Sequence, residues 1–149
     1  MNTRVQFKST AFPKYENENN ETVNPHRWGK RLAEFVRDNL PRYGVATENI
    51  ICEDWGWLVN MKNDGSPVWI GCGVVDDNSD SGNRSELQIN LDGDDMAMTE
   101  FCLFVTAEVS LFTRLFKRVD TNPVLSDVVA ALEKMVADQG EFRDAEWGD

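Results

Sequence analysis

The feature that most constrains the fold is a pair of apolar, aromatic-rich runs, residues 50–61 and 68–75, with a short turn signal between them. The intervening residues 63–67 contain the dipeptide Asp64-Gly65, which tolerates the positive φ angles of tight hairpin turns. We therefore expect residues 50–61 and 68–75 to be antiparallel strands, joined at Asp64-Gly65.

Other segments add strands to this hairpin. Residues 4–10 and 87–91 alternate apolar and polar side chains, as half-buried strands do, and the second of them extends the hairpin into a meander. Residues 98–119 fit both a strand period and a helical period, and we predict a strand over 100–107 followed by a short helix or further strand around 111–116. A last strand is expected around 142–147.

Two helices are predicted from their opening residues and apolar stripes. Asn24-Pro25 is a typical helix start, and the helix is expected to end at Pro41. Asn122-Pro123 repeats that start, and Gly140 is expected to cap the second helix. Each helix carries one apolar stripe: Trp28, Leu32, Phe35, Val36 and Leu40 in the first, and Leu125, Val128, Val129, Leu132, Met135 and Val136 in the second.

The order β-α-β-β-β-(β)-α-β predicts an α+β fold: a two-layer sandwich of a mainly antiparallel sheet with two amphipathic helices on one face. The length of 149 residues suits a single domain over 1–149. Residues 14–22 are rich in Asn and Glu and have no period, so they are expected to form a mobile polar loop.

The charge distribution narrows the class of partner. The chain has a formal net charge of -11, and residues 51–100 hold two Lys/Arg against eleven Asp/Glu. This excess of acid argues against general nucleic-acid binding and against binding to anionic membranes, which need surplus Lys and Arg. No apolar run is long enough for a membrane span, and the first residues lack the apolar stretch of a secretory signal.

The chain lacks the motifs of common catalytic and metal sites. Cys52, Cys72 and Cys102 are scattered, which predicts reduced thiols and a cytoplasmic location, and His26 is the single histidine. The segment 76–82 does not have the ligand spacing of a calcium loop in either of its two registers, and there is no glycine-rich phosphate loop or nucleophile elbow. We therefore expect no cofactor, no metal ion and no catalytic residues.

The most unusual segment is Glu53-Asp54-Trp55-Gly56-Trp57. On a continuous strand, Trp55 and Trp57 would share one face, with Trp69 of the partner strand nearby. That face is either core under the helices or an exposed aromatic patch with an acidic rim, and the sequence leaves both open. The candidate binding residues are Glu53, Asp54, Trp55, Trp57, Trp69, Asp76, Asp77, Asp80, Asp94 and Asp95.

These residues favour a binding function over catalysis. The first hypothesis is a small acidic binding or inhibitor protein that presents carboxylates and tryptophans to a basic protein partner, in the manner of immunity proteins or nucleic-acid mimics. The second is an enzyme that uses a single carboxylate, Glu53 or Asp54, in a Trp-lined pocket. The third is a self-associating structural domain, a homodimer in which the basic first helix meets the acidic hairpins.

Overall fold

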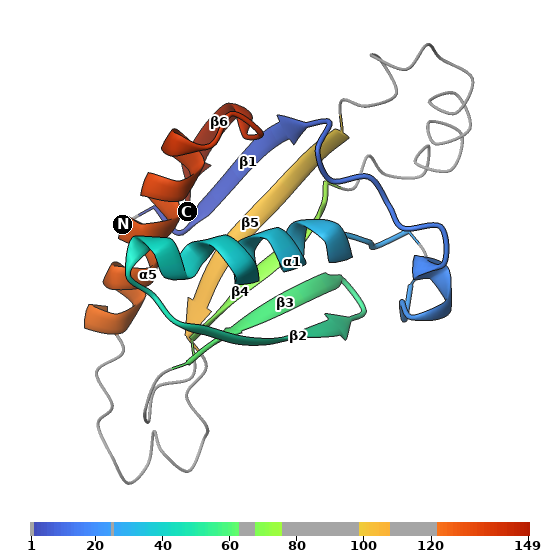
Figure 1. The fold of residues 1–149 in the computed structure, drawn as a ribbon, viewed down its shortest axis with the longest axis horizontal. Helices are drawn as coiled ribbons and strands as arrows, with labels where there is room; N and C mark the ends of the chain where they lie inside the picture. Colours follow the sequence, from blue (N-terminus) through green and yellow to red (C-terminus); the bar gives the residue numbers. More distant parts are fainter. Residues whose placement is uncertain (1, 25, 63–67, 76–98, 108–121) are drawn as a thin grey trace, which may run out of the picture.

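The computed structural model describes residues 2–24, 26–62, 68–75, 99–107 and 122–149. Within these ranges the chain forms a six-stranded antiparallel sheet of order β2-β3-β4-β5-β1-β6, together with two α-helices (Figure 1). The α+β class is therefore confirmed. The strands are β1 (Arg4–Ser9), β2 (Thr47–Glu53), β3 (Gly56–Met61), β4 (Val68–Val74), β5 (Thr99–Ala107) and β6 (Arg143–Gly148).

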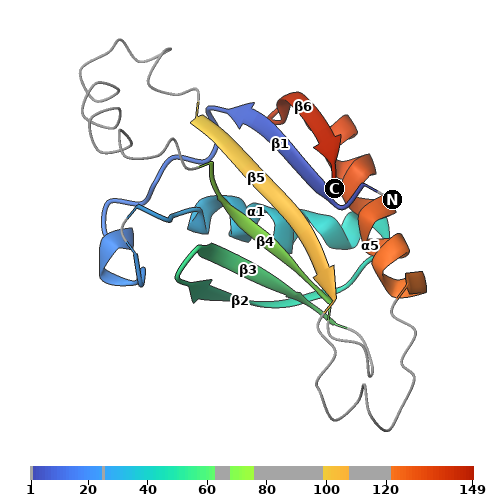
Figure 2. The same cartoon turned by 180° about the vertical axis from the view of Figure 1, so that it is seen from behind.

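Both helices bury their apolar stripes in one core on the same face of the sheet. Helix α1 (Lys30–Asn39) crosses β2, β3 and β4, and α5 (Asn122–Asp138) contacts β5 and the 3-10 turn η2 (Leu40–Tyr43). Their side chains form one cluster with alternate residues of the central strands, which are Val5, Phe7, Trp57, Val59, Met61, Val68, Ile70, Cys72, Phe101, Leu103 and Val105. No helix of the described ranges covers the opposite face, which Figure 2 shows in front. We call it the open face.

The prediction of a single strand over residues 50–61 is wrong, because these residues belong to two strands. Strands β2 and β3 form a hairpin whose turn is Asp54 and Trp55, with Glu53 paired to Gly56. Gly56 has a φ of 149°, a conformation that residues with a side chain rarely adopt, and a Cβ there would lie 2.7 Å from the Cys72 carbonyl oxygen. The chain thus reverses where a continuous strand was expected.

The first helix begins later than predicted. Asn24 accepts the His26 backbone N–H through its side chain, at 3.1 Å, and α1 starts only at Lys30. The start is displaced because the preceding loop contacts strand β4: Val74 N–H donates to the Trp28 carbonyl at 3.2 Å, and Gly29 lies against the backbone at Cys72 and Gly73. Pro41 follows the end of α1, inside η2.

Most of the other predicted elements are confirmed. Strands β1 and β5 and helix α5 lie where alternation or the apolar stripe placed them, and β5 settles residues 99–107 as strand. Strand β6 lies where the last strand was expected. Strand β3 pairs with β4 as expected, whereas the turn at Asp64-Gly65, the strand at 87–91 and the element at 111–116 lie outside the described residues. The described elements run β-α-β-β-β-β-α-β. This order matches the predicted one only because residues 47–61 form two strands instead of one.

Residues 14–22 contain a short 3-10 turn, η1 (Glu18–Asn20), and Glu18 is fully buried. The mobility predicted for this segment stays a prediction. Within the described ranges, no helix combines the length and the apolar character needed to cross a membrane.

Candidate functional site

The open face is built from the strand residues that alternate with the core. Gly71 of β4, Phe104 of β5 and Arg4 of β1 are paired in register, so they form one row across three strands. Leu58 and Cys102 are buried without belonging to the core cluster, as expected for residues of this second face.

Three aromatic side chains cluster on the open face: Trp55, Trp69 and Phe104. The rings of Trp55 and Trp69 are stacked, with centroids 5.5 Å apart, and Phe104 lies 5.1 Å from Trp55 and 5.7 Å from Trp69. All three side chains are half-buried. We call this group the aromatic cluster.

Gly71 makes the cluster possible. A Cβ at this position would lie 2.2 Å from Cζ of Phe104, so the phenyl ring occupies the space that a side chain at residue 71 would need. A glycine in a strand interior often marks such a close approach. The far end of the Phe104 ring therefore lies over Gly71 of β4, and the ring contacts Trp55 and Trp69.

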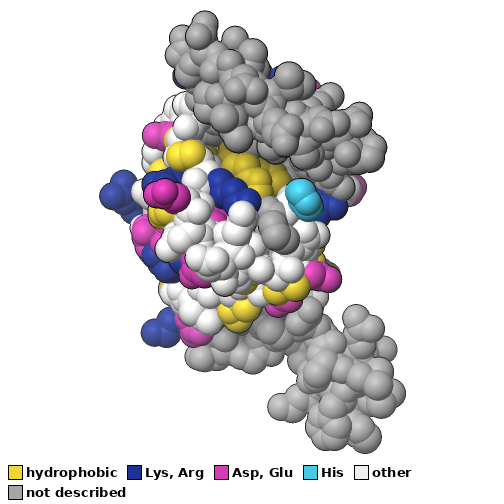
Figure 3. Space-filling model, turned by 90° about the vertical axis from the view of Figure 1, so that its right-hand side faces the viewer, with side chains coloured by type: hydrophobic (Ala, Val, Ile, Leu, Met, Phe, Trp, Pro, Cys, Tyr) yellow, Lys and Arg dark blue, Asp and Glu magenta, His cyan; other side chains and the backbone are white. Residues whose placement is uncertain are grey.

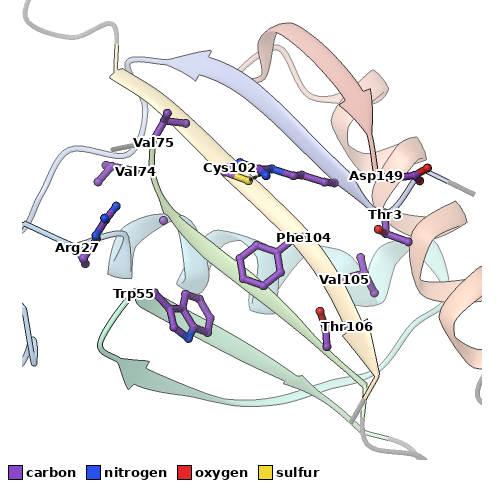
Figure 4. Close-up of a pocket in the computed structure, with 12 residues that line it drawn as sticks. Thr3, Arg27, Trp55, Val74, Val75, Cys102, Phe104, Val105, Thr106 and Asp149 are labelled. Atoms are coloured by element: carbon purple, nitrogen blue, oxygen red, sulfur yellow. Dashed lines mark hydrogen bonds between the residues drawn. The ribbon is translucent and has the colours of Figure 1, made fainter. Parts of the chain in front are cut away.

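A groove of about 560 Å³ lies beside the aromatic cluster. Figure 4 shows that it extends across β5, with Arg27 and Trp55 on one side of the strand and Thr3 and Asp149 on the other. Its described lining is Thr3, Arg4, Arg27, Trp55, Gly73, Val74, Val75, Cys102, Phe104, Val105, Thr106 and Asp149.

Arg4 and Cys102 meet at the wall of this groove. The Arg4 Nε donates a hydrogen bond to the Cys102 Sγ at 3.1 Å. Burial raises the pKa of the Cys102 thiol, and the hydrogen bond and charge of Arg4 lower it by less, so the net shift is upward. The group is therefore a neutral thiol near pH 7, whereas a nucleophilic cysteine needs a lowered pKa.

Trp57 does not belong to this site. Its ring faces the helices, is 5% exposed and lies in the core cluster. Trp55 and Trp57 thus lie on opposite sides of the sheet, because the Asp54-Trp55 turn interrupts the strand that would have aligned them. The sequence left open whether these two tryptophans are core residues or part of an exposed patch. Trp57 is a core residue, and Trp55 lies on the open face.

The predicted acidic residues are only partly placed. Glu53 ends β2 and is half-buried, and Asp54 is exposed in the turn beside Trp55. Asp76, Asp77, Asp80, Asp94 and Asp95 lie outside the described residues. On the side of the molecule shown in Figure 3, the acidic and basic side chains of the described part are interspersed, and hydrophobic side chains gather beside Lys or Arg.

Sequence reasoning missed Phe104, Arg4, Arg27 and Cys102. A signal for Phe104 and Cys102 was present, because they alternate in β5 with the core residues Phe101, Leu103 and Val105. Arg4 alternates in the same way with Val5 in β1. The pairing of β1 with β5, nearly a hundred positions apart, had no local signal.

No group of three or more His, Cys, Asp or Glu able to hold a metal ion is found among the described residues. Searches of protein-family models, of curated proteins and of solved structures give no significant match to this chain.

Proposed function

We propose that the protein is a binding protein, a two-layer domain whose open face contacts a protein partner. The observation that carries this proposal is the aromatic cluster, which holds two indoles and a phenyl ring on the sheet face opposite the helices. Half-buried aromatic side chains of this kind supply much of the affinity in protein interfaces. Trp55 and Trp69 are the residues of the predicted site that the cluster brings together.

The chemistry of the groove supports binding more than catalysis. Its described ionisable side chains are two arginines, one aspartate and the thiol of Cys102, whose pKa is raised. General acid–base catalysis near pH 7 needs a group poised to exchange a proton at that pH. Arginine does not lose its proton near pH 7. The raised pKa of the Cys102 thiol keeps that group protonated near pH 7 as well.

The charge of the chain supports a basic partner. The formal net charge is -11, and Glu53 and Asp54 directly precede Trp55 in the chain, at the edge of the cluster. Carboxylates around an aromatic centre steer a basic partner toward it and make the rate of association depend on salt. The three cysteines are free thiols, which supports the reducing cytoplasm as the place where the protein acts.

The proposal is tested by comparative capture. Immobilised wild-type protein and a Trp69→Thr variant are incubated with native lysate, and retained proteins are quantified by mass spectrometry. Threonine keeps the β-propensity of strand β4 while removing one indole. Val23→Thr is the matched control, because Val23 is 69% exposed and lies outside the sheet.

We expect a protein that is retained by wild type and by Val23→Thr, and lost with Trp69→Thr. The purified candidate should then bind directly, with an association rate that falls as salt is raised. Equal retention by all three proteins would contradict the assignment of the interface to the aromatic cluster.

A further inference from the structure

The groove has the make-up of a site for a small molecule. Its volume of about 560 Å³ falls within the range of known ligand pockets, roughly 300–1,000 Å³. Its described lining is about half apolar, from residues such as Val74, Cys102 and Phe104, and about half polar, with guanidinium groups as its cationic side chains. Polar groups placed among apolar ones fix the orientation of a bound ligand.

We propose that this groove binds a small planar aromatic carboxylate, with the carboxylate on Arg4 and the ring against Trp55 and Phe104. This site goes beyond the proposed function, because its occupancy does not depend on a protein partner.

Arg4 is positioned to receive the carboxylate. It is the register partner of Phe104 on the neighbouring strand, so the two side chains lie side by side on the open face. Its Nε donates a hydrogen bond to the Cys102 Sγ at 3.1 Å, and this bond orients the guanidinium plane at the groove wall. The two terminal nitrogens carry four further N–H donors in a fixed fork, a geometry that matches a carboxylate.

Trp55 and Phe104 form the contact for the ring. Their centroids are 5.1 Å apart and their planes meet at 55°, so they present an angled aromatic corner beside the groove. Aromatic pairs prefer offset-stacked or edge-to-face contacts, and a planar ring can make both in such a corner.

The cationic group at the Cys102 wall of the groove fits an anion. Arg4 lies at this wall, whereas Asp149, which bears a carboxylate, lies by Thr3 on the side of β5 away from Trp55 (Figure 4). Cys102 is a neutral thiol, so it adds no negative charge beside Arg4. A carboxylate hydrogen-bonded to Arg4 would thus meet opposite charge, whereas Trp55, which follows the acidic residue Asp54, contacts the uncharged ring.

The experiment is an NMR titration of the full chain labelled with ¹⁵N, using 2-naphthoate as the ligand. Binding should shift the Trp55 indole N–H and the backbone amides of Gly73 and Val74. 2-Naphthamide has the same ring system without the charge, and we expect it to bind about tenfold more weakly, as for the loss of one charge-assisted contact.

Two variants locate the carboxylate. Arg4→Gln should weaken 2-naphthoate binding about tenfold and leave 2-naphthamide binding nearly unchanged. Lys8→Gln is the matched control: it removes one positive charge from the same strand and the same face, outside the groove, and should leave both affinities unchanged.

Four outcomes would overturn the proposal. The first is equal affinity for the acid and the amide. The second is the same affinity in the Arg4→Gln and Lys8→Gln variants. The third is a set of shifts that omits Trp55, Gly73 and Val74, and the fourth is no shift at millimolar ligand.

Discussion

The indole Nε1 of Trp57 donates a hydrogen bond to the Oε2 of Glu18 at 3.2 Å, inside the protein. The same oxygen accepts the backbone N–H groups of Gly29 at 2.9 Å and Lys30 at 3.2 Å, at the start of α1. The other oxygen, Oε1, accepts the Tyr15 N–H at 3.2 Å. One fully buried carboxylate therefore joins the 14–22 segment, helix α1 and strand β3.

Replacing Glu18 should destabilise the fold. In Glu18→Gln an amide NH₂ takes the place of an acceptor oxygen, so at least one buried N–H faces another donor. We expect a loss of about 1–3 kcal/mol in the free energy of unfolding, measured by urea denaturation. Glu21→Gln is the control, because Glu21 is exposed and its ion pair with Lys30 should contribute about 0–1 kcal/mol. Equal losses in the two variants would contradict the role assigned to Glu18.

Trp57 should behave as a core residue. Trp57→Ala removes a side chain that is 5% exposed, and we expect it to cost about 3–5 kcal/mol in the free energy of unfolding. Trp57→Phe keeps most of the ring volume and loses the bond to Glu18, so its cost should be much smaller. A melt of Trp57→Ala that matches wild type would place this indole outside the core.

Gly56 should be intolerant of a side chain. A methyl group there would lie 2.7 Å from the Cys72 carbonyl oxygen, and the residue holds a φ of 149°. We expect Gly56→Ala to lower the free energy of unfolding by about 1–3 kcal/mol. At Gly140 an added Cβ meets nothing within 4 Å, so Gly140→Ala serves as the control and should change stability by less than about 0.5 kcal/mol.

The three thiols should differ in reactivity. Cys52 is half-buried, whereas Cys102 and Cys72 are buried, so a thiol reagent should modify Cys52 first in the native protein. Burial raises the pKa of Cys102 above the ordinary 9.0, so its labelling rate should still be rising above pH 9 as the thiolate fraction grows. Cys72, whose pKa burial raises furthest, should react last. Peptide mapping after timed labelling checks the order, and early labelling of Cys72 would contradict it.

The parts of the fold that the sequence predicted are those where burial follows a local period. In β5, Phe101, Leu103 and Val105 alternate toward the core, and in α5 Val128, Leu132 and Met135 form a stripe at helical spacing. The burial of one face of each element produces the apolar period in the sequence and also the packing seen in the structure.

The failures arose where contacts distant in sequence decide local structure. Asn24-Pro25 is a strong helix start, yet the bond from Val74 N–H to the Trp28 carbonyl holds that loop against β4. The strand expected over residues 50–61 includes Gly56, although in the structure Gly56 is the residue that follows a two-residue turn. For the site, Trp55 and Trp69 were predicted, but their contact with Phe104 depends on strand pairing and on the missing side chain of Gly71.

The measurement that tests the central claim most directly is the dissociation constant of the captured partner for Trp69→Thr, read beside the melting temperature of that variant. If the open face is the interface, the dissociation constant should rise about thirtyfold, as for a hot-spot residue of about 2 kcal/mol. The melting temperature should fall by only a few degrees, because Trp69 is half-buried and lies outside the core cluster. An unchanged dissociation constant in a folded Trp69→Thr protein would contradict the account.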